Sequence, residues 1–203
     1  METDNSITKQ KILDSAQDIF HAKGYDGARM QEIADKANIN KGLLHYYFKS
    51  KDSLFDAVFS IAFRKMLGQL ESTLIMEIPL EDKIDFIVDG YMTMLSKNST
   101  LPRFVMNEIN KNPDKFVAKH INGNIKKAFL IFENDIKKEV ETGNIRPIDP
   151  RQLCLNLIAM SVFPFMGRPI LQVVVGLNNK EFQLLLNERG EHIKAFIKQA
   201  IKL

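Results

Sequence analysis

Residues 37–51, with the sequence ANINKGLLHYYFKSK, combine side chains that suit contact with an anionic surface. Lys41, Lys49 and Lys51 supply ammonium groups, and the two adjacent tyrosines supply hydroxyl groups that can donate to phosphate oxygens while their rings pack below. Gly42 allows close approach of the backbone because it has no side chain. A buried helix would not keep so many polar ends, and a solvated helix would not keep so many rings. The stretch therefore indicates binding to a bulky, polar partner.

Each of these residues also has an ordinary structural explanation. The tyrosines could be half-buried aromatic residues, and the lysines after them could belong to a solvated turn. A glycine inside a helix costs about 1 kcal/mol relative to alanine, which asks for a reason without supplying one. Only the joint spacing of these residues favours a binding surface over these alternatives.

Short helices must position this stretch. Apolar residues at three- and four-residue steps predict a first helix that ends near Gly24 and a second over residues 30–37. Asn38 can adopt the left-handed conformation of a tight turn, and Asn40 is expected to cap a third helix over residues 41–48. Two short helices joined by the turn NINK make a helix-turn-helix, whose second helix can lie in the major groove of DNA.

The rest of the chain also has helical spacing. The strongest apolar periodicity runs through a fourth helix, which we expect to begin after Ser50 and to pass residue 70. Further helices are expected over residues 80–96, 102–110, 112–142, 149–166 and 179–202. Residues 170–176 (ILQVVVG) are expected to be a helix end or loop, because an isolated strand would have no partner. The expected fold class is all-α.

Size, charge and apolar content limit the function classes. The 203 residues carry a net charge of +3, and residues 1–51 contain eight Lys or Arg against seven Asp or Glu. Overall charge therefore does not identify a nucleic-acid binder, and the placement of charges must decide. The polar N-terminal stretch has no secretory signal, and the uncharged apolar stretch 153–167 is too short for a membrane span, so we expect a cytoplasmic protein. The single cysteine, Cys154, is expected in the core.

Residues 7–60 resemble the N-terminal domain of the tetracycline-repressor (TetR) family of bacterial regulators, without gaps. The matching pieces are IL at 12–13, F at 20, GY at 24–25, EIA at 32–34, KG at 41–42, YYF at 46–48 and KSK at 49–51. Any one piece is weak, but all of them in order at this spacing are highly specific.

The resemblance implies roles for individual residues. Arg29 would lie near a phosphate and Gln31 near a base edge, while the start of the third helix faces the groove. Leu43 and His45 depart from the small hydroxyl residue and the tyrosine that the family favours there, and Leu43 could offer only apolar contact, for instance to a thymine methyl. The full set of expected DNA contacts is Arg29, Gln31, Asn40, Lys41, Gly42, Leu43, His45, Tyr46, Tyr47, Lys49 and Lys51.

The resemblance fades after about residue 60, and the remaining helical part is rich in methionine and phenylalanine. Flexible thioethers and rings can line an adaptable apolar cavity, although any one of them could equally fill an ordinary core. The candidate pocket residues are Phe63, Met66, Tyr91, Met94, Phe104, Phe132 and Met160.

The last two helices are expected to form a homodimer interface, as the corresponding helices do in the family. A two-fold dimer presents two recognition helices, so its DNA operator should be a near-palindrome. The candidate interface residues are Leu153, Leu157, Ile193, Phe196, Ile197 and Ala200.

Two domains are thus expected, a helix-turn-helix DNA-binding domain over residues 1–50 and a helical domain for effector binding and dimerisation over residues 51–203. The resemblance implies a transcriptional regulator, most often a repressor, that binds a palindromic operator and is released by a small lipophilic effector. An alternative is a ligand-binding or protein-interaction module whose helix-turn-helix no longer binds DNA. An enzyme is disfavoured, because the four histidines are scattered and no HxxxH, CxxC or GxSxG motif occurs. No cofactor or metal is expected.

Overall fold

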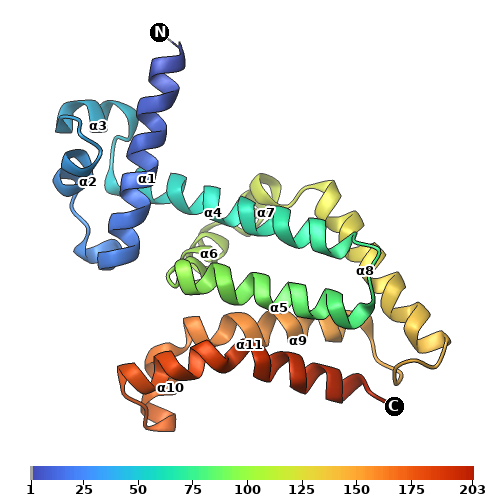
Figure 1. Cartoon of the computed structure of the whole chain (residues 1–203). Coiled ribbons are helices and arrows are strands. Elements are labelled where there is room, and N and C mark those ends of the chain that lie inside the picture. Colours follow the sequence, from blue (N-terminus) through green and yellow to red (C-terminus); the bar gives the residue numbers. More distant parts are fainter. Residues whose placement is uncertain (1) are drawn as a thin grey trace. The chain divides into compact units, whose positions relative to one another are not determined.

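The computed structural model describes residues 2–203, with side chains from Asn5 onward, and these residues form helices joined by short turns (Figure 1). The helices are α1 (Glu2–Gly27), α2 (Met30–Lys36), α3 (Lys41–Tyr47), α4 (Lys51–Leu74), α5 (Leu80–Lys97), α6 (Leu101–Lys111), α7 (Pro113–His120), α8 (Gly123–Glu141), α9 (Pro150–Met166), α10 (Arg168–Val175) and α11 (Asn179–Ile201). No strand occurs in this described part, so the all-α prediction is confirmed.

The chain divides into two compact units, of which the first ends at Arg64 and the second covers Lys65–Leu203. Helix α4 contributes its first turns to the N-terminal unit and its later turns to the C-terminal unit. Residue 50, where we expected the DNA-binding domain to end, directly precedes this helix.

The N-terminal unit packs α1, α2, α3 and the start of α4 around a small apolar core. Ile12 and Phe20 of α1, Ile33 of α2, Leu44 of α3 and Leu54 of α4 are all at most 1% exposed. These residues come from the three- and four-residue apolar spacing of each helix, so the spacing determines which face of each helix turns inward. At Gly24 the backbone leaves helical geometry (φ 69°, ψ −179°), which bends the end of α1 at the position where we expected the helix to end.

The C-terminal unit is built around α5, α9 and α11, which pack against one another, with α8 packing on both α5 and α9 (Figure 1). Its core contains Ile84 of α5, Phe132 and Ile136 of α8, Leu153 of α9 and Ile193 of α11, each at most 1% exposed. Gly190 of α11 faces Met92 of α5, and a Cβ at this position would make only ordinary van der Waals contact with the Met92 side chain, at 3.4 Å.

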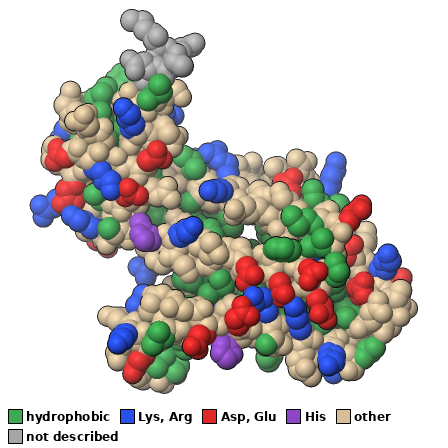
Figure 2. Space-filling model, viewed as in Figure 1, with side chains coloured by type: hydrophobic (Ala, Val, Ile, Leu, Met, Phe, Trp, Pro, Cys, Tyr) green, Lys and Arg blue, Asp and Glu red, His purple; other side chains and the backbone are tan. Residues whose placement is uncertain are grey.

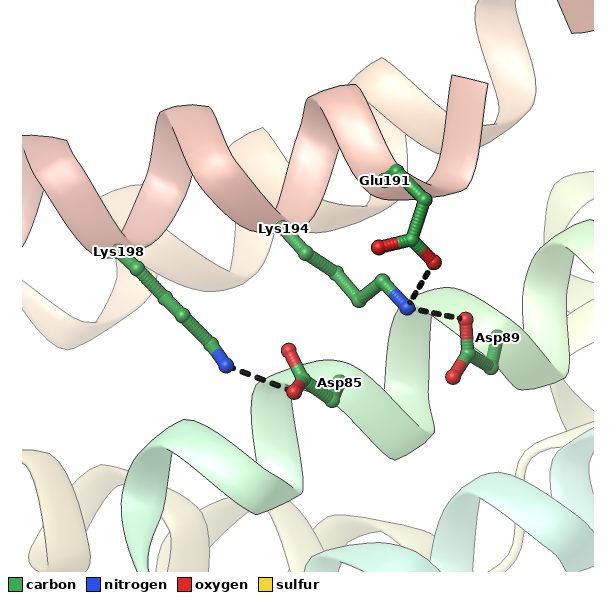
Figure 3. A network of polar contacts seen from close by, with 5 residues as sticks. All are labelled: Asp85, Asp89, Glu191, Lys194 and Lys198. Atoms are coloured by element: carbon green, nitrogen blue, oxygen red, sulfur yellow. Dashed lines mark hydrogen bonds and ion pairs between the residues drawn. The ribbon is translucent and has the colours of Figure 1, made fainter. Parts of the chain in front are cut away.

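A ladder of ion pairs also holds α11 on α5 (Figure 3). Lys194 Nζ lies 3.0 Å from Asp89 and 2.6 Å from Glu191, and Lys198 Nζ lies 2.6 Å from Asp85. The two aspartates and the two lysines are each four residues apart, so each pair of like charges lies on one face of its helix. The ladder therefore sets the relative register of α5 and α11.

Two expected elements differ from the structure. The helix expected over residues 112–142 is two helices, because Ile121 is extended and the Asn122 side chain caps α8 by accepting a hydrogen bond from Ile125 N at 3.0 Å. Residues 170–176 belong to a separate helix, α10, which has proline in its first turn and ends at Gly176 in the left-handed conformation.

Within the part of the chain described, no single helix has the length and apolar composition of a membrane span. Helices α9 and α10 reach that composition only when taken together, across a bend of 82°.

Candidate nucleic-acid interface

Helix α3 is fixed at its start by the turn that precedes it. Asn38 has a φ of 55°, and the Asn40 side chain accepts a hydrogen bond of 2.8 Å from Leu43 N. Both features were expected from the residue types, and they set the direction in which α3 begins. Leu44 (0% exposed) and Phe48 (6%) then hold the helix against the unit's core.

The opposite face of α3 is open. Lys41, Gly42, His45 and Tyr46 are exposed, with Tyr46 at 76%, while Leu43 is half-buried. A tyrosine this exposed contributes little to the core, and its hydroxyl is free to reach a phosphate oxygen of a partner. The exposed face of α3 therefore carries the residue types expected of a recognition helix.

Tyr47 is placed differently from its neighbour. Its ring meets that of Tyr46 edge to face with centroids 5.5 Å apart, and its hydroxyl donates to the side chain of Asn5, with Asn5 O 3.4 Å away. This contact ties the end of α3 to the start of α1. The hydroxyl must exchange Asn5 for a phosphate if it is to contact DNA.

Lys51, at the start of α4, has an internal role. Its Nζ donates to Tyr25 O at 2.8 Å and to Ala28 O at 3.1 Å, and it lies 4.3 Å from the centre of the Tyr25 ring. The Tyr25 hydroxyl in turn donates to Asp52 at 2.5 Å, and this hydrogen bond raises the pKa of Tyr25 to about 12. Lys51 therefore joins α4 to the connection between α1 and α2, and one N–H of its ammonium remains for a phosphate.

The partners Asn5, Tyr25 and Asp52 were missed from the sequence. Tyr25 falls within the GY pair of the family resemblance, but no spacing indicates that residues 25 and 51 meet. These contacts join segments that are far apart in the chain, and only the packed fold reveals them.

Charge pairing separates the cations of this unit into two groups. Lys23 pairs with Glu32 at 2.9 Å and Lys36 pairs with Asp18 at 2.8 Å, so both lysines join α1 to α2. Three other cations, Arg29, Lys41 and Lys49, are exposed, and no carboxylate pairs with them among the residues whose side chains are described. These three cations are therefore available to a phosphate although the unit is nearly neutral in total, and the face drawn in Figure 2 mixes both signs.

Gln31, in the first turn of α2, is exposed and donates to Asp35 at 2.8 Å. This bond uses one N–H of the amide, so its oxygen and the other N–H remain for a base edge. Arg29 is the N-cap residue of the same helix.

Three of the seven candidate pocket residues line a cavity described in the structure, and they line two different ones. Met66 and Tyr91 line a small cavity of about 30 Å³ between α4 and α5, which is the size of one water molecule. Phe132 (1% exposed) and Phe104 (7%) are buried, Met94 packs on the core, and Phe63 belongs to the N-terminal unit. Burial also raises the pKa of the Tyr91 hydroxyl to about 12.

A larger cavity of about 420 Å³ lies between α9, α10 and α11, and of the seven candidates only Met160 lines it. Its other walls are Ala159, Phe163, Pro164, Leu171, Val175, Leu177, Phe182, Leu185 and Arg189. This cavity was not expected from the sequence, because residues 170–176 were expected to be a helix end or loop, whereas α10 forms one of its walls.

The candidate interface residues fall into two groups. Leu153, Leu157, Ile193 and Ile197 are at most 2% exposed inside a single chain, so they stabilise the fold and cannot also face a second copy. Phe196 is 62% exposed and Ala200 is half-buried, so these two remain available. Both α9 candidates thus face inward, and the α11 candidates mix its inward and outward faces.

Comparisons with known proteins agree with this architecture. The family model described as bacterial regulatory proteins, tetR family, matches residues 12–58. The HTH-type transcriptional regulator RutR of Escherichia coli (strain K12) is 27% identical over 199 residues, which cover 97% of this chain and 92% of RutR. The biofilm operon icaADBC HTH-type negative transcriptional regulator IcaR of Staphylococcus aureus (strain Newman) is 32% identical over 102 residues, which cover 46% of this chain and 55% of IcaR.

Solved structures show the same fold. A transcriptional regulator from Saccharomonospora viridis in complex with choline has a TM-score of 0.72 at 18% identity, with 98% of this chain and 99% of that chain covered. A regulator of the TetR/AcrR family from Thermobifida fusca has a TM-score of 0.68 at 17% identity, with 93% and 95% covered.

The matched relatives are transcriptional regulators, and the match over residues 12–58 coincides with the helices that present the exposed face of α3. Residues 12–58 therefore match the tetR family of bacterial regulatory proteins, and the relatives that the chain resembles along its length are transcriptional regulators rather than enzymes.

Proposed function

We propose that this protein is a cytoplasmic transcriptional repressor that binds a near-palindromic DNA operator as a homodimer and is released by a small lipophilic effector. The observation that carries the DNA-binding part is the exposed face of α3, where Tyr46 and Lys41 project beside Gly42 and no acidic partner is described for the lysine. Phosphate contacts from Lys41, Lys49 and Arg29 would position α3, while Gln31, Leu43 and His45 would contact base edges.

The homodimer would use the outward faces of α9 and α11. Leu155 and Phe163 of α9 are each 57% exposed, and Phe196 of α11 is 62% exposed. Exposed aromatic and aliphatic side chains on two adjacent helices form the kind of apolar surface that a second copy covers in a two-fold dimer. Two copies would present two α3 helices, which is why the operator should be a near-palindrome.

Release would follow from ligand binding in the C-terminal unit. Helix α4 runs through both units, so a ligand that prefers one arrangement of the C-terminal unit can change how well two α3 helices match one DNA turn, ~34 Å. The ligand needs only to bind the DNA-incompetent state more tightly than the other state.

The test is a DNA-binding titration with a charge-matched control. Operator DNA is first selected by the purified protein from random duplexes, and binding is then measured by fluorescence anisotropy at increasing salt. Lys41→Ala should weaken binding to all duplexes and reduce the slope of log K against log salt by about 1, because one phosphate contact is lost. Lys36→Ala removes the same charge from a lysine already paired with Asp18, so its slope should equal that of the parent.

The outcome also separates this proposal from a helix-turn-helix that no longer binds DNA. If no sequence is enriched and binding is weak at every salt concentration, the DNA-binding part of the proposal is wrong. Equal slopes for the Lys41 and Lys36 variants would instead remove Lys41 from the interface.

A further inference from the structure

The cavity between α9, α10 and α11 is almost entirely apolar. Aliphatic and aromatic side chains from all three helices form its walls, and the volume of about 420 Å³ lies within the range of small-molecule sites. Phe182, at the start of α11, is 1% exposed and forms a rigid wall. The cavity can therefore hold an apolar chain of moderate length.

One lining residue, Arg189, is charged. Its Nε and Nη2 lie 3.4 Å from Met160 O, which is a long and weak contact, and no carboxylate pairs with it among the side chains described. Partial burial lowers the pKa of the Arg189 guanidinium, and no neighbouring acid offsets that effect. A guanidinium has five N–H donors, so most of them are left for a ligand.

A second cation lies behind the cavity wall. The Arg168 guanidinium is 5.4 Å from the centre of the Phe182 ring, and it donates to the neutral amides of Gln172 and Asn179 at 3.3 Å and 3.2 Å. Neither arginine is neutralised by a described carboxylate, whereas Arg151 on the same helix as Met160 pairs with Asp149 at 2.9 Å. Both arginines at the cavity therefore lack a described carboxylate partner.

We propose that this cavity binds an amphiphilic carboxylate, whose apolar chain lies among Met160, Leu171 and Phe182 and whose carboxylate accepts hydrogen bonds from Arg189. An arginine fork matches a carboxylate in geometry and charge, because it can donate two parallel N–H···O hydrogen bonds to the two carboxylate oxygens. A neutral alcohol of the same length would gain the apolar contacts without the ion pair. An amine would place two cations together.

The cavity also shares residues with the face proposed for the homodimer. Phe163 lines the cavity and is 57% exposed, and Ala159 and Leu185 at its rim are exposed as well. A second copy docked on this face would cover the mouth of the cavity, so ligand binding would alter the packing between the two copies. This regulatory link rests on the proposed function, but the binding site itself does not.

The test compares three ligands of equal chain length, octanoate, 1-octanol and octylamine, by isothermal titration calorimetry of the full chain below their micelle concentrations. Octanoate should bind at least about tenfold more tightly than the other two, because only it pairs with Arg189. Arg189→Met should weaken octanoate binding by roughly ten- to a hundredfold and leave 1-octanol within about twofold. Arg151 is an exposed residue of α9, so Arg151→Gln should change the affinity for neither octanoate nor 1-octanol.

The binding position is checked separately. The chain contains no tryptophan, so Leu185→Trp at the cavity rim places a single fluorophore there. Its emission should shift when octanoate is added. Ala159→Phe should fill the cavity and remove binding of both octanoate and 1-octanol.

Equal affinity for octanoate and 1-octanol, an unchanged Arg189→Met variant, a silent Leu185→Trp reporter, or no binding of octanoate would each overturn the proposal. Should Arg189→Met fail to fold, the ligand series on the parent protein and the Arg189→Lys variant, which keeps the charge but loses the fork, still decide it. These measurements use no DNA, so they stand even if operator binding fails. If octanoate binds in this cavity but does not change DNA affinity, the binding-site proposal holds and the cavity is not the effector site.

Discussion

At the scale of single residues, whether a lysine has an acidic partner says more about its availability for binding than the total charge of the unit does. Lys23 and Lys36 are paired with acids and join α1 to α2, whereas Lys41 has no described acidic partner and is available to a ligand. Adjacent tyrosines differ in the same way, since the Tyr46 side chain is exposed and the Tyr47 hydroxyl is bonded to Asn5. Substitutions at these positions should therefore separate binding from folding.

The two tyrosines give the first prediction. Tyr46→Phe should weaken binding to all operator sequences about equally, without changing the free energy of unfolding, because only a hydroxyl that points to solvent is removed. Tyr47→Phe should lower the free energy of unfolding by about 1 kcal/mol, because it breaks the hydrogen bond to Asn5. Urea denaturation followed by circular dichroism, together with DNA anisotropy, checks both. A larger stability loss for Tyr46→Phe would contradict the assignment.

Cys154 gives a second prediction, based on its pKa. Burial of the thiol, and secondarily the charge of Glu133, raises that pKa from 9.0 to about 11. The native thiol should therefore react slowly with iodoacetamide at pH 8, and its rate should rise about tenfold per pH unit up to pH 11, because the thiolate is the nucleophile. The raised pKa also makes the fold less stable as the pH rises from about 9 to about 11, because the unfolded chain ionises its thiol there and the folded chain does not. Labelling in urea provides the unfolded reference, and an equally fast native rate would contradict the prediction.

The features of the site that could be predicted from the sequence are those that depend on residues close together in the chain. The turn at Asn38, the cap at Asn40 and the outward face of α3 depend on neighbouring residues, and they were expected correctly. The partners of Tyr47 and Lys51 lie 42 and 26 residues away along the chain, so local spacing cannot indicate them.

At the scale of elements, capping residues determined most helix starts. Asn112, Asp149 and Asn178 each accept a hydrogen bond from a backbone N–H of the helix that follows. The break at residues 121–122 was missed because asparagine inside a polar stretch is also tolerated in a helix. Helix α10 was missed because its β-branched residues resemble a strand, while its solvent-facing Val173 (82% exposed) gives no core pattern.

The turn before α3 gives a prediction at this scale. Asn38→Ala should lower the free energy of unfolding by about 1 kcal/mol, because alanine lacks the local hydrogen bonding that makes a φ of 55° acceptable to asparagine. Asn38→Gly is the matched control and should be at least as stable as the parent, since glycine adopts this conformation readily. Chemical denaturation of both variants measures the difference, and an Ala variant as stable as the Gly variant would show that the turn is not strained.

At the scale of the whole molecule, the C-terminal unit leaves apolar side chains of α9 and α11 exposed, and these form the surface proposed for the homodimer. Helical periodicity predicted that α9 and α11 would each bury one face. It could not say whether that face meets the same chain or a second copy, because both environments favour the same residue types. The exposed fraction of each side chain separates the two cases, since Leu153 and Ile193 are buried within the chain while Leu155 and Phe196 face solvent.

The dimer surface gives the last prediction. Phe196→Arg should convert a dimer to a monomer, because a charge would be buried without a partner at the interface, and operator affinity should fall with it. Leu130→Arg is the matched control, since Leu130 on α8 is 58% exposed but lies outside the proposed surface. Sedimentation velocity measures the mass of each variant. A Phe196→Arg protein that keeps the parent's mass would place the interface elsewhere.

The link between Tyr47 and Asn5 has a practical consequence for anyone who purifies this protein. Fusing an affinity tag ahead of α1, or trimming the chain past Asn5, would disturb the hydrogen-bond partner of a tyrosine on the proposed recognition helix. A tag after Leu203 leaves that contact untouched. Binding constants obtained with the two tag positions should therefore be compared before either one is attributed to the native chain.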